Sequence, residues 1–192
     1  MITSINFSNL EKLQRAGKWR LAENIIFKEV GQLIKSGADI IGICSNTGNE
    51  CAERIQRKIK KPLIHIADPI GIYLKKNNIK NVGLIGTIYT MEKEYIKEFL
   101  EKNYKVKVFI PDKKDRVFIN RVIYEELCRG IIKEKSRRGY LTIMNKIIKL
   151  YNLDGFILGC TEIPLLINQK DISIKLIDST KLHAEYLAKK SL

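Results

Sequence analysis

The sequence predicts an α/β protein in which short parallel strands alternate with helices. Three observations support this. Short runs of Ile, Val and Leu recur along the 192-residue chain, and such near-continuous runs are typical of parallel strands covered on both faces. Longer segments with apolar residues at helical spacing separate the runs. Alternation of the two patterns favours βαβ units with right-handed crossovers.

The apolar runs predict strands at residues 5–7, 40–43, 63–66, 82–85, 106–109, 156–158 and 176–177. Helical spacing predicts helices over residues 18–35, 92–102, 116–133 and 140–151. Gly37 follows the first helix and is expected to end it, since glycine readily adopts the left-handed conformation found there. No low-complexity segment or flexible linker interrupts the pattern.

A weak internal repeat predicts two similar lobes. Residues 37–44 and 153–160 each run from a helix end, through a short apolar strand, to a cysteine. The polar break at residues 75–78 is the best boundary. We therefore expect a first lobe of residues 1–76 plus 178–192 and a second lobe of residues 77–177. Ligands of α/β folds bind outside the carboxyl ends of strands, so both strand ends are expected to face one cleft.

The composition argues against several classes of protein. The net charge is +14, from 35 basic and 21 acidic residues. However, basic and acidic residues alternate on the predicted helical faces, and no aromatic residues are interleaved with the basic ones, as base stacking would require. We therefore expect no nucleic-acid partner. No apolar run reaches membrane-spanning length and no signal peptide is evident, which predicts a cytoplasmic protein with no membrane partner. Four scattered cysteines and two histidines predict neither disulfides nor a metal site.

Cys160 is the strongest candidate for a reactive group. It follows a predicted buried strand and precedes Thr161 and Glu162. If a helix began there, its dipole and neighbouring donors would lower the thiol pKa below the usual value of about 8.5. Cys51 and Cys128 lie within helical patterns, so we expect both to be structural.

Residues 159–166, Gly-Cys-Thr-Glu-Ile-Pro-Leu-Leu, resemble the second signature of the aspartate/glutamate racemase family, and residues 37–47 resemble the first. Residues 86–92, 119–127 and 178–185 are also similar to that family, so the resemblance covers nearly the whole chain. It implies two pseudo-symmetric lobes around a cleft, a homodimer, and racemisation of aspartate or glutamate without pyridoxal phosphate, another cofactor or a metal.

In such a site two acid/base groups face opposite sides of the substrate α-carbon, and the resemblance places Cys160 and Ser45 in these roles. The family's substrate-binding positions fall on Gln14, Asn46, Thr47, Thr87, Thr90 and Thr161. The threonines and Asn46 could instead cap helices, and Gln14 could be an exposed helix residue. Glu162 could orient Cys160 or cap the next helix. His183 could lie near the second base or be a buried structural histidine, and His65 is expected to be structural.

The sequence departs from the family pattern in two places. A cysteine usually occupies the position of Ser45, whereas Cys44 stands one residue earlier and is expected to turn away from the cleft. Serine is a poor general base, so we expect slower or directionally biased proton exchange. The family's opening strand, Gly-Gly-Met-type loop and helix have no match here, so the first lobe is expected to be shortened. The alternative is an impaired or inactive homologue that binds an acidic metabolite or serves as an assembly protein.

Overall fold

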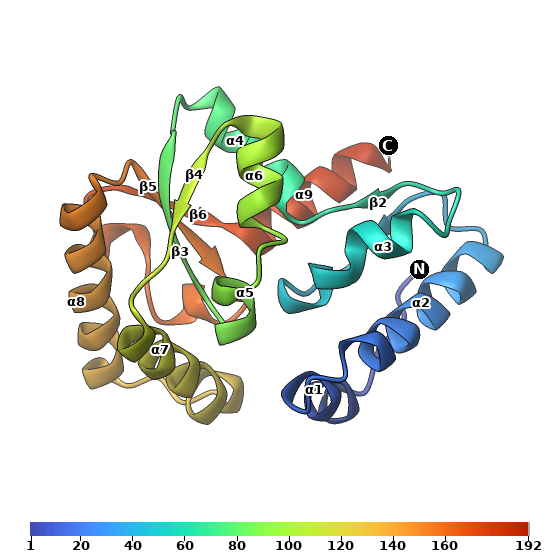
Figure 1. Ribbon diagram of the computed structural model, residues 1–192, viewed down its shortest axis with the longest axis horizontal. Helices are drawn as coiled ribbons and strands as arrows, with labels where there is room; N and C mark the ends of the chain where they lie inside the picture. Colours follow the sequence, from blue (N-terminus) through green and yellow to red (C-terminus); the bar gives the residue numbers. More distant parts are fainter. Residues whose placement is uncertain (192) are drawn as a thin grey trace.

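The structure, a computed structural model, describes residues 1–191 and contains two parallel sheets. The main sheet has the strand order β4-β3-β5-β6, and every neighbouring pair is parallel. Its strands are β3 (Asn81–Gly86), β4 (Lys107–Phe109), β5 (Gly155–Gly159) and β6 (Lys175–Asp178). The small sheet pairs β1 (Ile41–Gly42) with β2 (Leu63–Ile64), also in parallel. The predicted α/β fold with parallel sheets is thereby confirmed, and the two sheets lie in separate parts of the molecule (Figure 1).

Helices cover both faces of the main sheet. On one face lie α7 (Lys113–Glu125) and α8 (Glu134–Tyr151), and on the other lie α4 (Ala67–Lys76), α6 (Lys97–Tyr104) and α9 (Ser179–Lys190). Strand β5 shows the alternation clearly: Phe156 and Leu158 join the α7/α8 core, whereas Ile157 joins the α4/α6 core. Because both faces are buried, the strand reads as a continuous apolar run.

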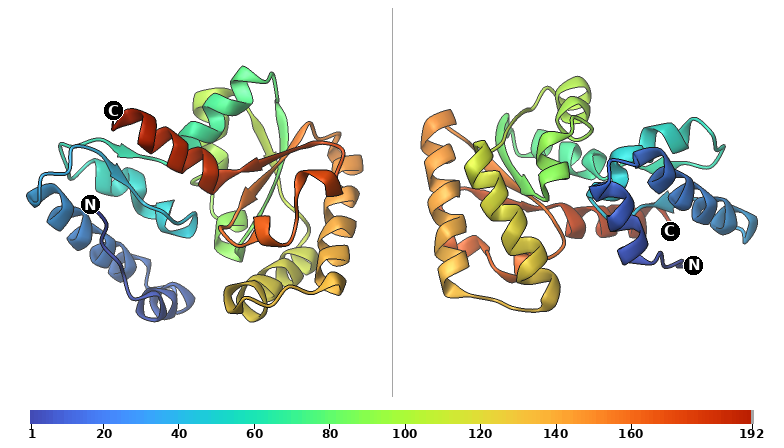
Figure 2. Two further views of the ribbon diagram at one scale, coloured as in Figure 1. Left: turned by 180° about the vertical axis from the view of Figure 1, so that it is seen from behind. Right: turned by 60° about the horizontal axis from the view of Figure 1, so that its bottom comes forward.

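The small sheet is covered by α2 (Trp19–Lys35) and α3 (Ala52–Gln56), which share a core with both of its strands. Figure 2 shows α9 extending from the main sheet toward the small sheet. There Leu187 of α9 lies so close to Gly42 that a Cβ on Gly42 would stand 2.4 Å from its side chain. Helix α4 follows β2 and packs Ile70 and Leu74 into the core of the main sheet, so α4 and α9 both connect the two sheets.

The strand predicted at residues 5–7 is wrong. Helix α1 (Phe7–Arg15) begins there instead, and the Asn6 side chain caps it by accepting a hydrogen bond from the Asn9 amide at 3.2 Å. A capped start followed by apolar residues at helical spacing favours the helix. The other six predicted strands are confirmed, with small differences at their ends.

Several helices begin or end at residues other than those predicted. The helix predicted over 92–102 is α6, which begins only at Lys97, and a separate short helix, α5 (Ile88–Glu92), precedes it. The break is needed because Met91 belongs to the core on one face of the main sheet and Ile96 to the core on the other. The helix predicted over 116–133 ends at Glu125, before a 3₁₀ turn and Gly130 at φ 71°. Helix α8 begins at Glu134, earlier than expected, whereas Gly37 follows α2 at φ 93° as predicted.

Within residues 1–191, no helix is long and apolar enough to cross a membrane.

Candidate functional site

A cavity of about 470 Å³ lies beyond the carboxyl ends of β1 and β5. Eight of the predicted site residues line it: Gln14, Ser45, Asn46, Thr47, Thr87, Cys160, Thr161 and Glu162. They come from α1, from the segment after β1, and from the segments after β3 and β5. The cavity is therefore formed by both parts of the molecule. Thr90 and His183 do not line it.

The segment after β1 presents Ser45 in a tight turn. The Gly48 amide donates a hydrogen bond to Ser45 Oγ at 3.1 Å. A Cβ at Gly48 would stand 3.2 Å from the Ser45 Cβ, so a glycine allows the turn to close on the serine. Ser45 is followed by a 3₁₀ helix, Thr47–Cys51. Cys44 is exposed and also lines the cavity, so the expectation that it turns away is wrong; the strand ends at Gly42, before alternation can orient it.

Asn46 is only 4% exposed, and its amide has a fixed orientation. Its Nδ2 donates to Ser179 Oγ at 2.9 Å, and Ser179 Oγ donates to the Leu158 carbonyl at 2.7 Å. Since that serine proton is committed to a carbonyl, Ser179 can only accept from Asn46. The Asn46 Oδ1 is buried and has no hydrogen-bond partner within the described residues. A buried acceptor without a partner is costly, so this oxygen is available to accept from a donor at the cavity.

Three threonine hydroxyls meet across the two parts of the molecule. Thr47 Oγ1 lies 2.9 Å from Thr87 Oγ1 and 3.3 Å from Thr90 Oγ1, and the last two are 3.1 Å apart. Thr87 caps α5 by accepting from the Thr90 amide at 3.2 Å, so the cap is Thr87 and not Thr90. Thr90 is fully buried and supports the other two from behind the cavity wall.

Cys160 holds its proton more tightly than the sequence suggested. It is 7% exposed, and its Sγ lies 2.9 Å from a Glu162 carboxylate oxygen, to which it donates. Burial first, and then the negative charge of Glu162, raise the Cys160 pKa well above its usual value. The predicted lowering is therefore wrong. No α-helix begins here, since only a 3₁₀ turn at Ile163–Leu165 follows, so the expected helix dipole is missing.

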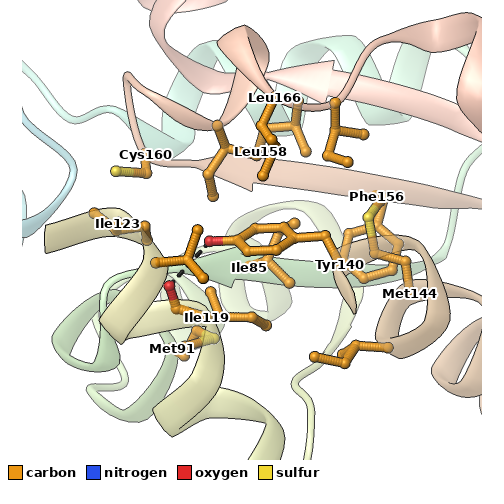
Figure 3. Packing of buried hydrophobic residues seen from close by; sticks show 14 of the residues in the cluster. Ile85, Met91, Ile119, Ile123, Tyr140, Met144, Phe156, Leu158, Cys160 and Leu166 are labelled. Atoms are coloured by element: carbon orange, nitrogen blue, oxygen red, sulfur yellow. Dashed lines mark hydrogen bonds between the residues drawn. The ribbon is translucent and has the colours of Figure 1, made fainter. Parts of the chain in front are cut away.

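Figure 3 shows Cys160 at the edge of the α7/α8 core, with its sulfur pointing away from Leu158 and Tyr140. Its carbon atoms pack in that core while the thiol borders the cavity. Thr161 is exposed at the same edge. Glu162 precedes the 3₁₀ turn at Ile163–Leu165, but its side chain makes no capping hydrogen bond and instead contacts Cys160.

His183 and His65 belong to the framework. His183 is buried in α9 and places Nε2 3.1 Å from the Ile64 carbonyl of β2. His65 Nδ1 accepts from the Ala67 amide at 3.2 Å, and its ring stacks on Phe99. Burial, together with His183, lowers the His65 pKa to about 4. These contacts are those of structural histidines.

Sequence reasoning missed several residues around the cavity. Cys128 and Tyr124 line it, and Cys128 is exposed rather than buried. Although the residue is exposed, partial desolvation of the thiol first, and then the charge of Glu162, raise the Cys128 pKa. Gly130, which ends the 3₁₀ turn, was the signal that Cys128 lies in a turn and not in a helix. Among residues 1–191, no group of three or more His, Cys, Asp or Glu side chains could hold a metal ion.

The fold and the cavity define a class: an α/β protein with a cavity between two parallel sheets, at the carboxyl ends of their strands, where α/β folds bind their ligands. The sequence model of the Asp/Glu/Hydantoin racemase family matches residues 1–187. The chain belongs to this family, which confirms the resemblance seen in its motifs.

Individual relatives agree with this assignment. A candidate Asp/Glu racemase from Yersinia pestis is 38% identical, with a TM-score of 0.91 over 100% of this chain and 83% of that one. An aspartate racemase homologue from Pyrococcus horikoshii OT3 is 29% identical, with a TM-score of 0.85 over 100% of this chain and 82% of that one. A glutamate racemase from Persephonella marina is 31% identical over 170 residues, which are 83% of this chain and 61% of that protein. The chain thus spans about three fifths of the length of its curated relatives.

Proposed function

We propose that this protein racemises aspartate or glutamate by removing the α-proton and returning one to the opposite face, without pyridoxal phosphate, another cofactor or a metal. One observation carries the proposal: Ser45 and Cys160 follow strands of different sheets and line one cavity. Two proton-transfer groups on opposite walls are what inversion of an α-carbon requires.

The other lining groups fit the ionic ends of an amino acid. The buried Asn46 Oδ1 is an acceptor suited to the substrate ammonium. The hydroxyls of Thr47, Thr87 and Thr161 can donate to carboxylates. Gln14 is nearly buried in α1 and lines the cavity, where its amide can donate to a second carboxylate. An acidic amino acid uses all of these groups.

Proton transfer begins at the Cys160–Glu162 pair. Because the resting thiol is protonated, the Glu162 carboxylate accepts its proton as the substrate enters, and the thiolate then removes the α-proton. Ser45 gives its hydroxyl proton to the opposite face, and after the product leaves, the proton held by Glu162 returns to Ser45 through solvent, which restores the resting state. Serine is a weak acid, so transfer through Ser45 is the slower half of the reaction.

The test is the entry of solvent deuterium into the α-position, followed by proton NMR in D₂O with each enantiomer of aspartate and glutamate. We expect exchange with at least one of these amino acids. Cys160→Ser should abolish exchange, while Cys44→Ala, also at the cavity wall, should retain it. Absence of exchange for all four substrates in folded protein would contradict the proposal.

A binding function without catalysis is the second candidate, since Ser45 is a poor base and the Cys160 pKa is raised. It predicts that acidic amino acids raise the thermal midpoint while no α-proton exchanges. An assembly role without ligand predicts neither effect.

We further propose a cytoplasmic homodimer, on the family resemblance alone. Light scattering at several protein concentrations tests the dimer, and a single monomeric mass would contradict it.

A further inference from the structure

Tyr95, in the link between α5 and α6, does not line the cavity but contacts Asn46 and Thr90 next to it. Its hydroxyl lies 2.8 Å from the backbone carbonyl of Asn46 and 3.3 Å from Thr90 Oγ1. Burial raises the Tyr95 pKa, so the phenol is neutral and carries one proton. A carbonyl can only accept, so that proton goes to Asn46 and Thr90 donates to the phenol oxygen. Tyr95 thus joins the main-sheet side of the cavity to the backbone between Ser45 and Thr47.

Other contacts cross between the same two walls, but they differ in kind. Thr47 reaches Thr87 and Thr90 through its hydroxyl, the group that a bound carboxylate would engage. Lys93 reaches Glu50 at 3.3 Å, farther along the chain and with a partly exposed ammonium, so this ion pair contributes little. The Tyr95 bond holds main chain, and ligand binding leaves it intact.

Resting on the racemase function proposed above, we propose that Tyr95 is a positioning residue that fixes the Ser45–Thr47 segment at the correct distance from Cys160. Proton transfer across a substrate depends steeply on geometry, and a misplacement of about 1 Å can cost roughly 100-fold. Cys160 sits on the other wall and is not held by this bond. Loss of the Tyr95 hydroxyl should therefore impair the Ser45 half of the reaction selectively.

The experiment compares Tyr95→Phe with Tyr104→Phe. The control removes the Tyr104 hydroxyl, which bonds to Asp68 away from the cavity. In D₂O, with the enantiomer whose α-proton faces Cys160, exchange with retention reports proton transfer at Cys160, and inversion requires both groups. We expect Tyr95→Phe to lower inversion at least about tenfold while exchange with retention changes less than twofold. Tyr104→Phe should leave the ratio of inversion to exchange unchanged. An unchanged ratio in Tyr95→Phe would overturn the inference.

A second measurement does not depend on activity. Amide hydrogen exchange by mass spectrometry should show faster exchange in peptides covering residues 45–49 of Tyr95→Phe, and no change there in Tyr104→Phe. If the wild-type protein proves inactive, the racemase proposal fails and this measurement still decides whether Tyr95 holds the segment. Equal exchange at residues 45–49 in the wild type and Tyr95→Phe overturns the inference.

Discussion

Cys160 keeps its proton in the free protein because two effects act in the same direction. Its burial disfavours a thiolate, and the neighbouring Glu162 carboxylate repels one. The same carboxylate accepts the thiol hydrogen bond at 2.9 Å, so it is also the nearest group able to take the proton away. In our proposal Glu162 therefore opposes the thiolate at rest and generates it during the reaction.

Glu162→Gln separates these two effects. Removing the negative charge should lower the Cys160 pKa, so the pH dependence of Cys160 alkylation by iodoacetamide should move to lower pH. Removing the proton acceptor should reduce α-proton exchange by about 100-fold or more. Peptide mapping distinguishes Cys160 from the exposed Cys44 and Cys128. The exposed Glu125→Gln serves as the control. If exchange survives in Glu162→Gln, Glu162 is not the acceptor.

The polar lining residues that follow β1, β3 and β5 were predictable, because strand ends in an α/β fold gather at one edge, whereas the apolar wall from the amino-terminal segment and α2 was not. Ser179 and Tyr95 were not, since the bond from Asn46 to Ser179 spans 133 residues and that from Tyr95 to Asn46 spans 49. The raised Cys160 pKa was also missed. Burial raises this pKa, and no helix dipole lowers it because no α-helix begins after Cys160. The local sequence shows neither the burial of the thiol nor the absence of the helix.

At the scale of elements, β3 and β5 pack so closely that side-chain size is fixed at particular positions. Gly83 of β3 pairs with Phe156 of β5. A Cβ at Gly83 would stand 2.6 Å from the Phe156 ring, which is fully buried and has no free space. By contrast, Gly31 in α2 has no atom within 4 Å of the position of a Cβ. A methyl group added at Gly83 would therefore clash with the core, whereas one added at Gly31 would enter open space.

Gly83→Ala should destabilise the protein by roughly 1–3 kcal/mol, because the added methyl group overpacks the core. Gly31→Ala should stabilise it by up to about 1 kcal/mol, since alanine favours a helix interior over glycine. Urea denaturation of both variants measures the two free energies of unfolding. Equal effects of the same sign would show that packing at the Phe156 ring does not decide the outcome.

The elements themselves were predicted with uneven success, for physical reasons. The central strands β3 and β5 of the main sheet are buried on both faces, so composition alone identifies them. Residues 5–7 contain two apolar residues around Asn6, and the cap at Asn6 starts a helix there. The α5–α6 break was hidden because Met91 and Ile96 are both apolar, and only the fold shows that they enter different cores.

At the scale of the whole molecule, a pair of histidines lies where the small sheet meets the main one. His183 of α9 contacts the last residue of β2, and His65 directly follows that strand. The His65 ring stacks on Phe99 of α6 at 4.4 Å between centroids and lies edge-on to Tyr95 at 6.2 Å. Its Nε2 is buried without a partner among the described residues. The junction therefore accommodates a neutral imidazole and resists a charged one.

Acid should weaken this junction through His65. Its pKa is lowered from 6.5 to about 4, by burial first and then by His183. Above pH 6.5 the ring is neutral in both the folded and unfolded states. As pH falls from 6.5 toward 4, the unfolded chain binds a proton that the folded protein excludes, so stability is lost progressively. A shift of this size corresponds to about 3 kcal/mol by pH 4.

His65→Asn isolates this contribution. An asparagine oxygen can still accept from the amide two residues on, as Nδ1 does from Ala67, but it does not titrate. The variant loses the stacking on Phe99 and should be less stable at pH 7. Urea denaturation at pH 7, 6, 5 and 4 should show the wild-type advantage shrinking as pH falls. His183, whose pKa is also lowered, remains in both proteins, so its contribution largely cancels. A wild-type advantage that stays constant from pH 7 to 4 would mean that His65 is protonated equally in both states, and that the junction does not exclude the charge.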